Sequence, residues 1–193
     1  MLDPMHEHEG WHGLMETATR IGNHLWVERR LFEWLGSWSR VPLEAELATF
    51  LGEMSARHGW HAELLFARLP ELREVDPESL VRPGSTAAGE LLDAVCVDPD
   101  ASQALEALVG YQRVLLPVVL GSYRSLVAGA NPASDAALVR WLGFVVGDDV
   151  DEWLRGDALV RGVLVRGAED VDRAAERQRE LEALLQGCPS FPT

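Results

Sequence analysis

Four long segments of this sequence repeat their apolar residues with the period of an α-helix, and none alternates apolar and polar residues as a strand does. The segments span about residues 14–38, 42–70, 101–127 and 136–160. In the first of them, Ile21, Leu25, Phe32 and Leu35 recur at helical spacings. The pattern predicts an all-α protein in which each helix buries an apolar face.

The connection between the second and third segments is longer than a turn between neighbouring helices. Residues 71–100 hold three prolines and leave room for one short helix near residues 87–95. Such a connection allows the chain to travel the length of a bundle, whereas an up-down bundle needs a short one. Two helical hairpins, residues 13–70 and 101–162, joined by one long crossover, predict a ferritin-like four-helix bundle.

The remaining segments complete a single domain over residues 1–193. The third helix is the most apolar, which predicts that it is the most buried, and Pro117 in its middle predicts a kink. An additional amphipathic C-terminal helix is expected over residues 168–186, where it could cover an exposed bundle face or form a homodimer. Residues 1–12 are expected to be a flexible N-terminal segment.

The charge and the apolar content of the sequence argue against two classes of binding partner, nucleic acids and membranes. The net charge is −14, with 31 acidic and 17 basic residues, so the surface repels nucleic-acid phosphates and anionic membranes. No apolar run reaches the roughly 20 residues of a membrane span, and the N-terminus has no signal-peptide pattern. We therefore expect a cytoplasmic protein without nucleic-acid or membrane partners. All basic residues are arginine, which suggests a GC-rich bacterial gene and leaves no lysine for Schiff-base chemistry.

Ionisable residues interrupt the apolar faces of three predicted helices. Glu28 lies on the apolar stripe of the first helix, His58 and His61 on that of the second, and Asp149 and Glu152 on that of the fourth. Tyr111 faces inward from the third, between Leu108 and Leu115.

An isolated buried charge costs several kcal/mol, so these side chains should meet one another or a cation. Two explanations remain open. Glu28, His58, His61, Asp149 and Glu152 could bind one or two metal ions, because carboxylate and imidazole ligands suit Fe, Mn or Zn. They could equally form a metal-free network of carboxylates and charged histidines.

The helical pattern and the crossover resemble the ferritin-like superfamily over about residues 10–165. Di-iron members carry Glu-x-x-His motifs. Glu28 matches the first-helix glutamate, and the segments 58–61 and 149–152 occupy the places of the two motifs. The first has His58 where Glu is expected and the second ends in Glu152 where His is expected, so the ligand set is altered. The segment from His58 to Glu71 also resembles uncharacterised bacterial ferritin-like proteins.

The resemblance implies Fe or Mn as cofactor and oxidation or hydroxylation of a small-molecule substrate. In this reading His58 and Tyr111 are the catalytic residues, with His58 a ligand or proton relay and Tyr111 an outer hydrogen-bond donor. The alternative is a metal-free scaffold or protein-interaction module. The histidines at positions 6, 8 and 12 are interpreted as part of a solvated terminus, with a lid over the bundle end as the lesser alternative.

Overall fold

The computed structural model describes residues 11–71, 73–165, 167–189 and 191–192. Within these ranges the chain is helical and contains no strand, which confirms the predicted all-α class. The long helices are α1 (Leu14–Ser37), α2 (Ala45–Phe66), α5 (Leu116–Ala128), α6 (Ala136–Leu164) and α7 (Ala168–Gln186). The shorter elements are η1 (Trp38–Arg40), η2 (Pro77–Leu80), α3 (Thr86–Val95), η3 (Ala101–Gln103), α4 (Ala104–Val109) and η4 (Gly110–Leu115).

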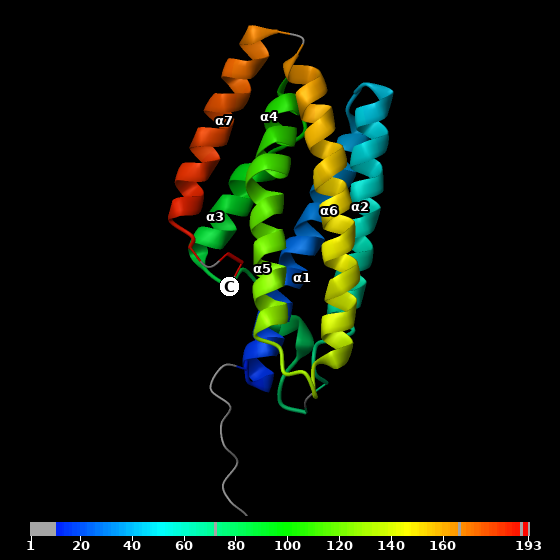
Figure 1. The fold of residues 1–193 in the computed structure, drawn as a ribbon, viewed down its shortest axis with the longest axis vertical. Coiled ribbons are helices and arrows are strands. Elements are labelled where there is room, and N and C mark those ends of the chain that lie inside the picture. The colour runs from blue at the N-terminus through cyan, green and yellow to red at the C-terminus, as the bar shows by residue number, and fades with distance from the viewer. Residues whose placement is uncertain (1–10, 72, 166, 190, 193) are drawn as a thin grey trace, which may run out of the picture.

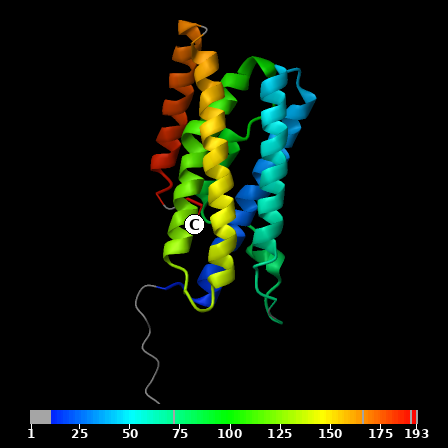
Figure 2. The ribbon, with the colours of Figure 1, turned by 45° about the vertical axis from the view of Figure 1, so that its right-hand side comes forward.

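Helices α1, α2, α5 and α6 lie side by side along the long axis of the molecule (Figures 1 and 2). Helix α2 returns antiparallel to α1, and α6 returns antiparallel to α5. The segment between residues 67 and 100 begins at the lower end of the bundle in Figure 1, where α2 ends, and leads to the upper end, where α4 begins. The faces that the two helix pairs turn toward each other therefore enclose one long core.

The third core helix is divided by a π-helical turn. Helix α4 passes into η4, a π-helix over Gly110–Leu115, and α5 follows with Pro117 in its first turn. Because α5 continues directly from η4, the missing N–H of Pro117 removes one backbone hydrogen bond from a continuous helix. The sequence predicts a kink at Pro117, and the structure has a π turn directly before this residue. A π turn adds one residue to the helical turn.

Helix α7 covers the face formed by α3, α4 and η4 (Figure 1). A close approach is possible because Gly110 has no side chain: a Cβ there would lie 2.6 Å from Cδ1 of Leu181. Arg173 of α7 also forms an ion pair with Glu106 of α4, with 2.9 Å between Nε and Oε1. Contact with these elements is one of the two roles expected for the C-terminal helix.

The apolar core follows the predicted stripe of the first helix except at Phe32. Phe32, placed on the core stripe of the first helix, is 47% exposed, because its ring lies over Gly59 at the outer edge between α1 and α2. The segment Ala101–Ala128 is long and apolar enough for a membrane span, but 67% of its apolar window is buried within the protein, as in a core helix.

Candidate metal centre

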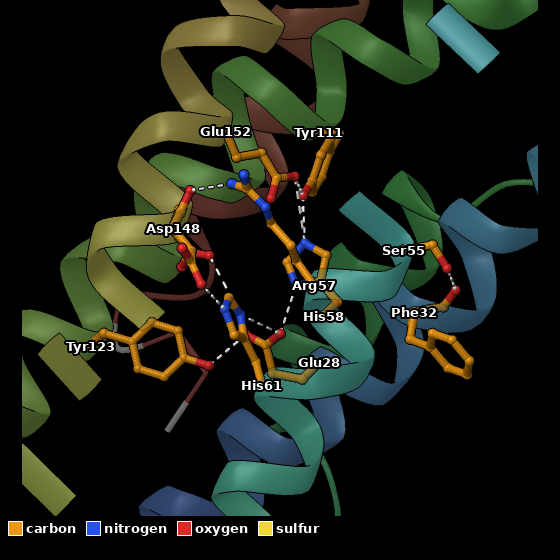
Figure 3. Close-up of polar contacts among 11 residues, drawn as sticks. Glu28, Phe32, Ser55, Arg57, His58, His61, Tyr111, Tyr123, Asp148 and Glu152 are labelled. Atoms are coloured by element: carbon orange, nitrogen blue, oxygen red, sulfur yellow. Dashed lines mark hydrogen bonds and ion pairs between the residues drawn. The ribbon is translucent and has the colours of Figure 1, made fainter. Parts of the chain in front are cut away.

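Seven polar side chains meet in the centre of the bundle, and Figure 3 shows those of Glu28, His58, His61, Tyr111, Tyr123 and Glu152 converging from five elements of the fold. We call this set the polar core; it comprises Glu28 of α1, His58 and His61 of α2, Tyr111 of η4, Tyr123 of α5, and Asp149 and Glu152 of α6. Each has a relative exposure of 0%. The six residues singled out from the sequence therefore lie together and inside the protein, and Tyr123 joins them.

Helical spacing brings these side chains inward. On α2, Met54, His58, His61 and Leu65 are three or four residues apart and all are buried, so one face carries both imidazoles into the bundle. The same spacing on α6 places Asp149 and Glu152 on one buried face with Leu142 and Val145. Apolar residues above and below the ionisable ones exclude water from them.

His61 lies among carboxylates with its two ring nitrogens in different surroundings. Nδ1 is 3.5 Å from Oε2 of Glu28 and 3.7 Å from Oδ1 of Asp149. Nε2 is 3.3 Å from Oδ2 of Asp148, whose side chain is 38% exposed. An N–H on Nε2 can therefore be donated to Asp148, while Nδ1 faces the two buried carboxylates.

His58 has both ring nitrogens engaged. Nδ1 is 2.6 Å from Oε2 of Glu28, and Nε2 is 2.5 Å from the hydroxyl oxygen of Tyr111. Tyr111 in turn donates its hydroxyl proton to Oε1 of Glu152. A continuous chain of hydrogen bonds therefore runs from Glu28 through His58 and Tyr111 to Glu152.

Several polar atoms of this region have no hydrogen-bond partner among the residues that the structure describes. They are Nδ1 of His61, both carboxylate oxygens of Asp149, Oε2 of Glu152 and both amide atoms of the buried Gln112. Leaving such groups unpaired typically costs about 1–3 kcal/mol each, and more for a charged group. A cation at the His61 side would satisfy Nδ1 and the Asp149 oxygens together.

The electrostatics of the metal-free polar core place opposite charges next to each other. Burial raises the pKa of Glu28, but the charges of His58 and His61 and the hydrogen bond from His58 outweigh it, so that pKa lies below its usual range. Burial lowers the pKa of His58, but the carboxylates of Glu28 and Glu152 hold it well above the usual value. Burial and the Glu28 charge raise the pKa of Asp149 to about 8. The metal-free form thus pairs a carboxylate with an imidazolium and keeps Asp149 largely protonated at neutral pH.

Glu28, His58 and His61 also satisfy the distance requirement for a shared cation. One donor atom from each lies within 4.8 Å of the others, and all three residues are buried. Together with the 3.7 Å between His61 Nδ1 and Asp149 Oδ1, this spacing brings four of the five expected ligands to one side of the polar core. Glu152 lies at the other side, with its Oε1 3.6 Å from Nε2 of His58.

Tyr123, Asp148 and Gln112 belong to this region but were not identified from the sequence. Tyr123 donates to Oε1 of Glu28, and the π turn accounts for its position. At 100° per residue, twelve residues of regular α-helix would place Tyr123 about 120° around the helix from Tyr111. The extra residue of a π turn reduces this angle to about 20°, so both phenols face the polar core. Apolar periodicity contains no signal for such a shift.

His24, one turn before Glu28, is buried outside the hydrogen-bonded chain. Its Nδ1 donates to the backbone oxygen of Arg20 at 2.8 Å, its Nε2 lies 2.9 Å from Oγ of Ser122, and its ring stacks on Tyr123. Burial lowers the pKa of His24 to about 4, and this effect outweighs the opposing influence of the Arg20 carbonyl and the Glu28 charge. His24 is therefore neutral at physiological pH.

We expect this histidine to make the protein sensitive to acid. The unfolded state takes up a proton near pH 6.5 and the folded state only near pH 4, so the contribution of His24 is fully present above pH 6.5 and is lost as pH falls to 4. The expected loss is about 3 kcal/mol relative to His24→Gln. Urea unfolding of both proteins between pH 7 and pH 4 measures it. Parallel stability curves for the two proteins would contradict the prediction.

The comparisons with known proteins give no assignment: no protein-family model, no curated protein and no solved structure matches this chain. The function is therefore argued from the geometry of the polar core.

Proposed function

We propose that this chain is a ferritin-like helical protein that binds Fe or Mn in its polar core and uses the metal to oxidise or hydroxylate a small molecule. Its ligands are Glu28, His61 and Asp149, with His58 beside them as ligand or proton relay. The bound metal would supply the redox chemistry, while the chain orients the ligands and excludes water. The antiparallel helix pairs and the long connection between α2 and α4 support the ferritin-like assignment.

The observation that carries the proposal is the arrangement around His61. Metal-binding histidines almost always donate their second ring N–H to a carboxylate, a backbone carbonyl or water, which fixes the tautomer and raises the basicity of the other nitrogen. Asp148 stands in that relation to Nε2, and Nδ1 faces Glu28 and Asp149 without a hydrogen bond within the described part of the chain. A neutral His61 that gives its Nε2–H to Asp148 presents the lone pair of Nδ1 between two carboxylates, as a metal ligand does, whereas a protonated His61 would form an ion pair with them in the metal-free protein.

A groove next to the polar core supports a small-molecule substrate. Its volume is about 970 Å³, and its lining includes Leu108, three residues before Tyr111, and Arg155, three residues after Glu152. The groove therefore begins one helical turn from the His58 side of the polar core. Phe50 and Leu159 contribute to its largely apolar wall, which suits an apolar substrate.

The second candidate is a metal-free scaffold, favoured by the unbroken chain from Glu28 to Glu152. Two carboxylates paired with an imidazolium form a self-sufficient structural network at the His58 side. In that case the bundle would serve as an interaction module, and the unpaired atoms of Asp149 would remain as a cost to stability.

Metal analysis separates the two candidates. The protein is purified without a histidine tag, incubated with Fe(II) or Mn(II) under nitrogen and desalted. The proposal predicts a stoichiometric amount of metal retained by the wild type and lost in Glu28→Ala and Asp149→Asn variants that keep their helical circular dichroism. A wild type that retains neither metal after reconstitution would establish the scaffold instead.

Asp148→Asn tests the orienting role of Asp148. An asparagine keeps the size of the side chain but weakens the hold on the Nε2–H of His61, so the affinity for the metal should fall by about 10–100-fold. Competition with a chelator of known affinity measures the change. Asp151→Asn is the matched control, since Asp151 is an exposed acid on the same helix that pairs with Arg57. An equal effect in both variants would point to loss of surface charge rather than to His61.

A further inference from the structure

The His58 side of the polar core contains three donor atoms in mutual contact. His58 Nε2 is 2.5 Å from the hydroxyl oxygen of Tyr111 and 3.6 Å from Oε1 of Glu152. Tyr111 and Glu152 are themselves hydrogen-bonded through the same two oxygens. Imidazole, phenol and carboxylate thus meet at one point, between α2, η4 and α6 (Figure 3).

The surroundings of His58 repeat the arrangement found at His61, with the ring nitrogens exchanged. Glu28 accepts from Nδ1 of His58 at 2.6 Å, which leaves Nε2 to face Tyr111 and Glu152. At His61 it is Asp148 that accepts from Nε2, while Nδ1 faces inward. Each histidine therefore has one nitrogen on a carboxylate and the other directed at oxygen donors, which is the outer arrangement of metal-bound imidazoles.

Two further observations indicate that this point is a site rather than a closed network. Oε2 of Glu152 is buried and has no hydrogen-bond partner in the described ranges of the chain, although Oε1 is engaged. Tyr111 lies within the π turn Gly110–Leu115, and π turns occur frequently at functional sites.

We propose that His58, Tyr111 and Glu152 form a second metal position in which Tyr111 is a phenolate ligand, and that this position takes a hard trivalent ion such as Fe(III). The inference rests on the proposed function and extends it, because Tyr111 becomes a ligand rather than an outer donor. Tyrosine is an established iron ligand in proteins, and carboxylate and imidazole complete a donor set that suits iron.

The metal takes the place of two protons when it binds. In the metal-free form Tyr111 gives its only hydrogen to Glu152, so Nε2 of His58 must donate to the Tyr111 oxygen while Nδ1 donates to Glu28. Metal binding breaks the Nε2–H bond and the phenol O–H bond and forms a metal–nitrogen and a metal–oxygen bond. Two protons leave to solvent, and no electron is transferred.

The sequence contains two tyrosines, and both lie in the polar core, which provides a matched control. Full-length protein is loaded with Fe(II) under nitrogen, oxidised with ferricyanide and desalted, and its iron content and visible absorption are measured. We expect a phenolate-to-Fe(III) charge-transfer band in the wild type and in Tyr123→Phe. The band should be lost in Tyr111→Phe.

Resonance Raman spectra of the wild type, excited in this band, should show phenolate vibrations, so the proposal does not depend on the folding of a variant. Iron retained without the band or the vibrations would overturn the phenolate position and leave the proposed function standing. A band that disappears in Tyr123→Phe but persists in Tyr111→Phe would overturn it as well. A band that persists in Asp149→Asn, in which the metal at Glu28 and His61 is expected to be lost, would support a second position that is separate from the first. Protein that retains no iron would overturn the phenolate position, and protein that retains neither iron nor manganese would overturn the proposed function as well.

Discussion

Glu28→Ala is expected to lower the free energy of unfolding of the metal-free protein by about 3–5 kcal/mol. Glu28 lies at the centre of the polar core, where it accepts from Nδ1 of His58 and from the hydroxyl of Tyr123 and lies 3.5 Å from Nδ1 of His61. Removal of the carboxylate leaves the buried imidazolium of His58 without its nearest counter-charge and leaves a phenol without an acceptor.

Urea unfolding followed by circular dichroism measures this loss. Glu33→Ala is the control, because Glu33 is an exposed glutamate on the same helix and such substitutions usually change stability by less than about 0.5 kcal/mol. A loss in Glu28→Ala no greater than in Glu33→Ala would mean that the charges of the polar core are not coupled as the distances indicate.

Asp149→Asn should act in opposite directions on stability and on metal binding. In the metal-free protein burial and the charge of Glu28 raise the pKa of Asp149 to about 8, so the folded state disfavours the carboxylate that the unfolded state keeps ionised at neutral pH. An uncharged amide does not carry this cost, so the substitution should raise the free energy of unfolding at pH 7, at about 1.4 kcal/mol for each unit of the pKa difference. The same change removes an anionic ligand and should weaken metal binding by about 100-fold or more, beyond the effect expected for an outer partner.

Unfolding of the metal-free protein and metal affinity are measured on the same preparations. Simultaneous stabilisation and loss of metal would identify Asp149 as a ligand that the metal-free fold tolerates at a cost. A destabilised Asp149→Asn protein would instead assign Asp149 to a structural network. That outcome would favour the scaffold function.

The apolar periodicity of the sequence was sufficient to predict the helices and some residues of the polar core, because it relates residues that lie on one helix. It placed Glu28 on the buried stripe of α1 and both histidines on one face of α2, because residues three and four apart share a face. The same rule placed Phe32 on the core stripe, and this prediction is wrong because the side chain is half-exposed. The ring lies at the margin of the stripe, and the position of α2 decides that it covers Gly59 from outside.

Asp148 and Gln112 were not identified from the sequence for a different physical reason. Asp148 is half-exposed and adjacent to Asp149, so periodicity assigns it to the surface, and its role depends on a histidine from another helix. Gln112 is buried because its amide lies over Gly156, where a Cβ would approach to 2.1 Å. Contacts of this kind join residues more than 40 positions apart and leave no pattern within either helix.

The sequence alone determined that the chain forms long amphipathic helices and that acids and imidazoles face their interior, because these properties depend on local spacing and on the cost of burying charge. The tertiary structure decided which of these groups touch, which ring nitrogen of each histidine faces inward and which oxygens are left without a partner. Those properties depend on how the helices are rotated and staggered against one another. Around the third core helix, one π turn changes that rotation for every residue that follows it.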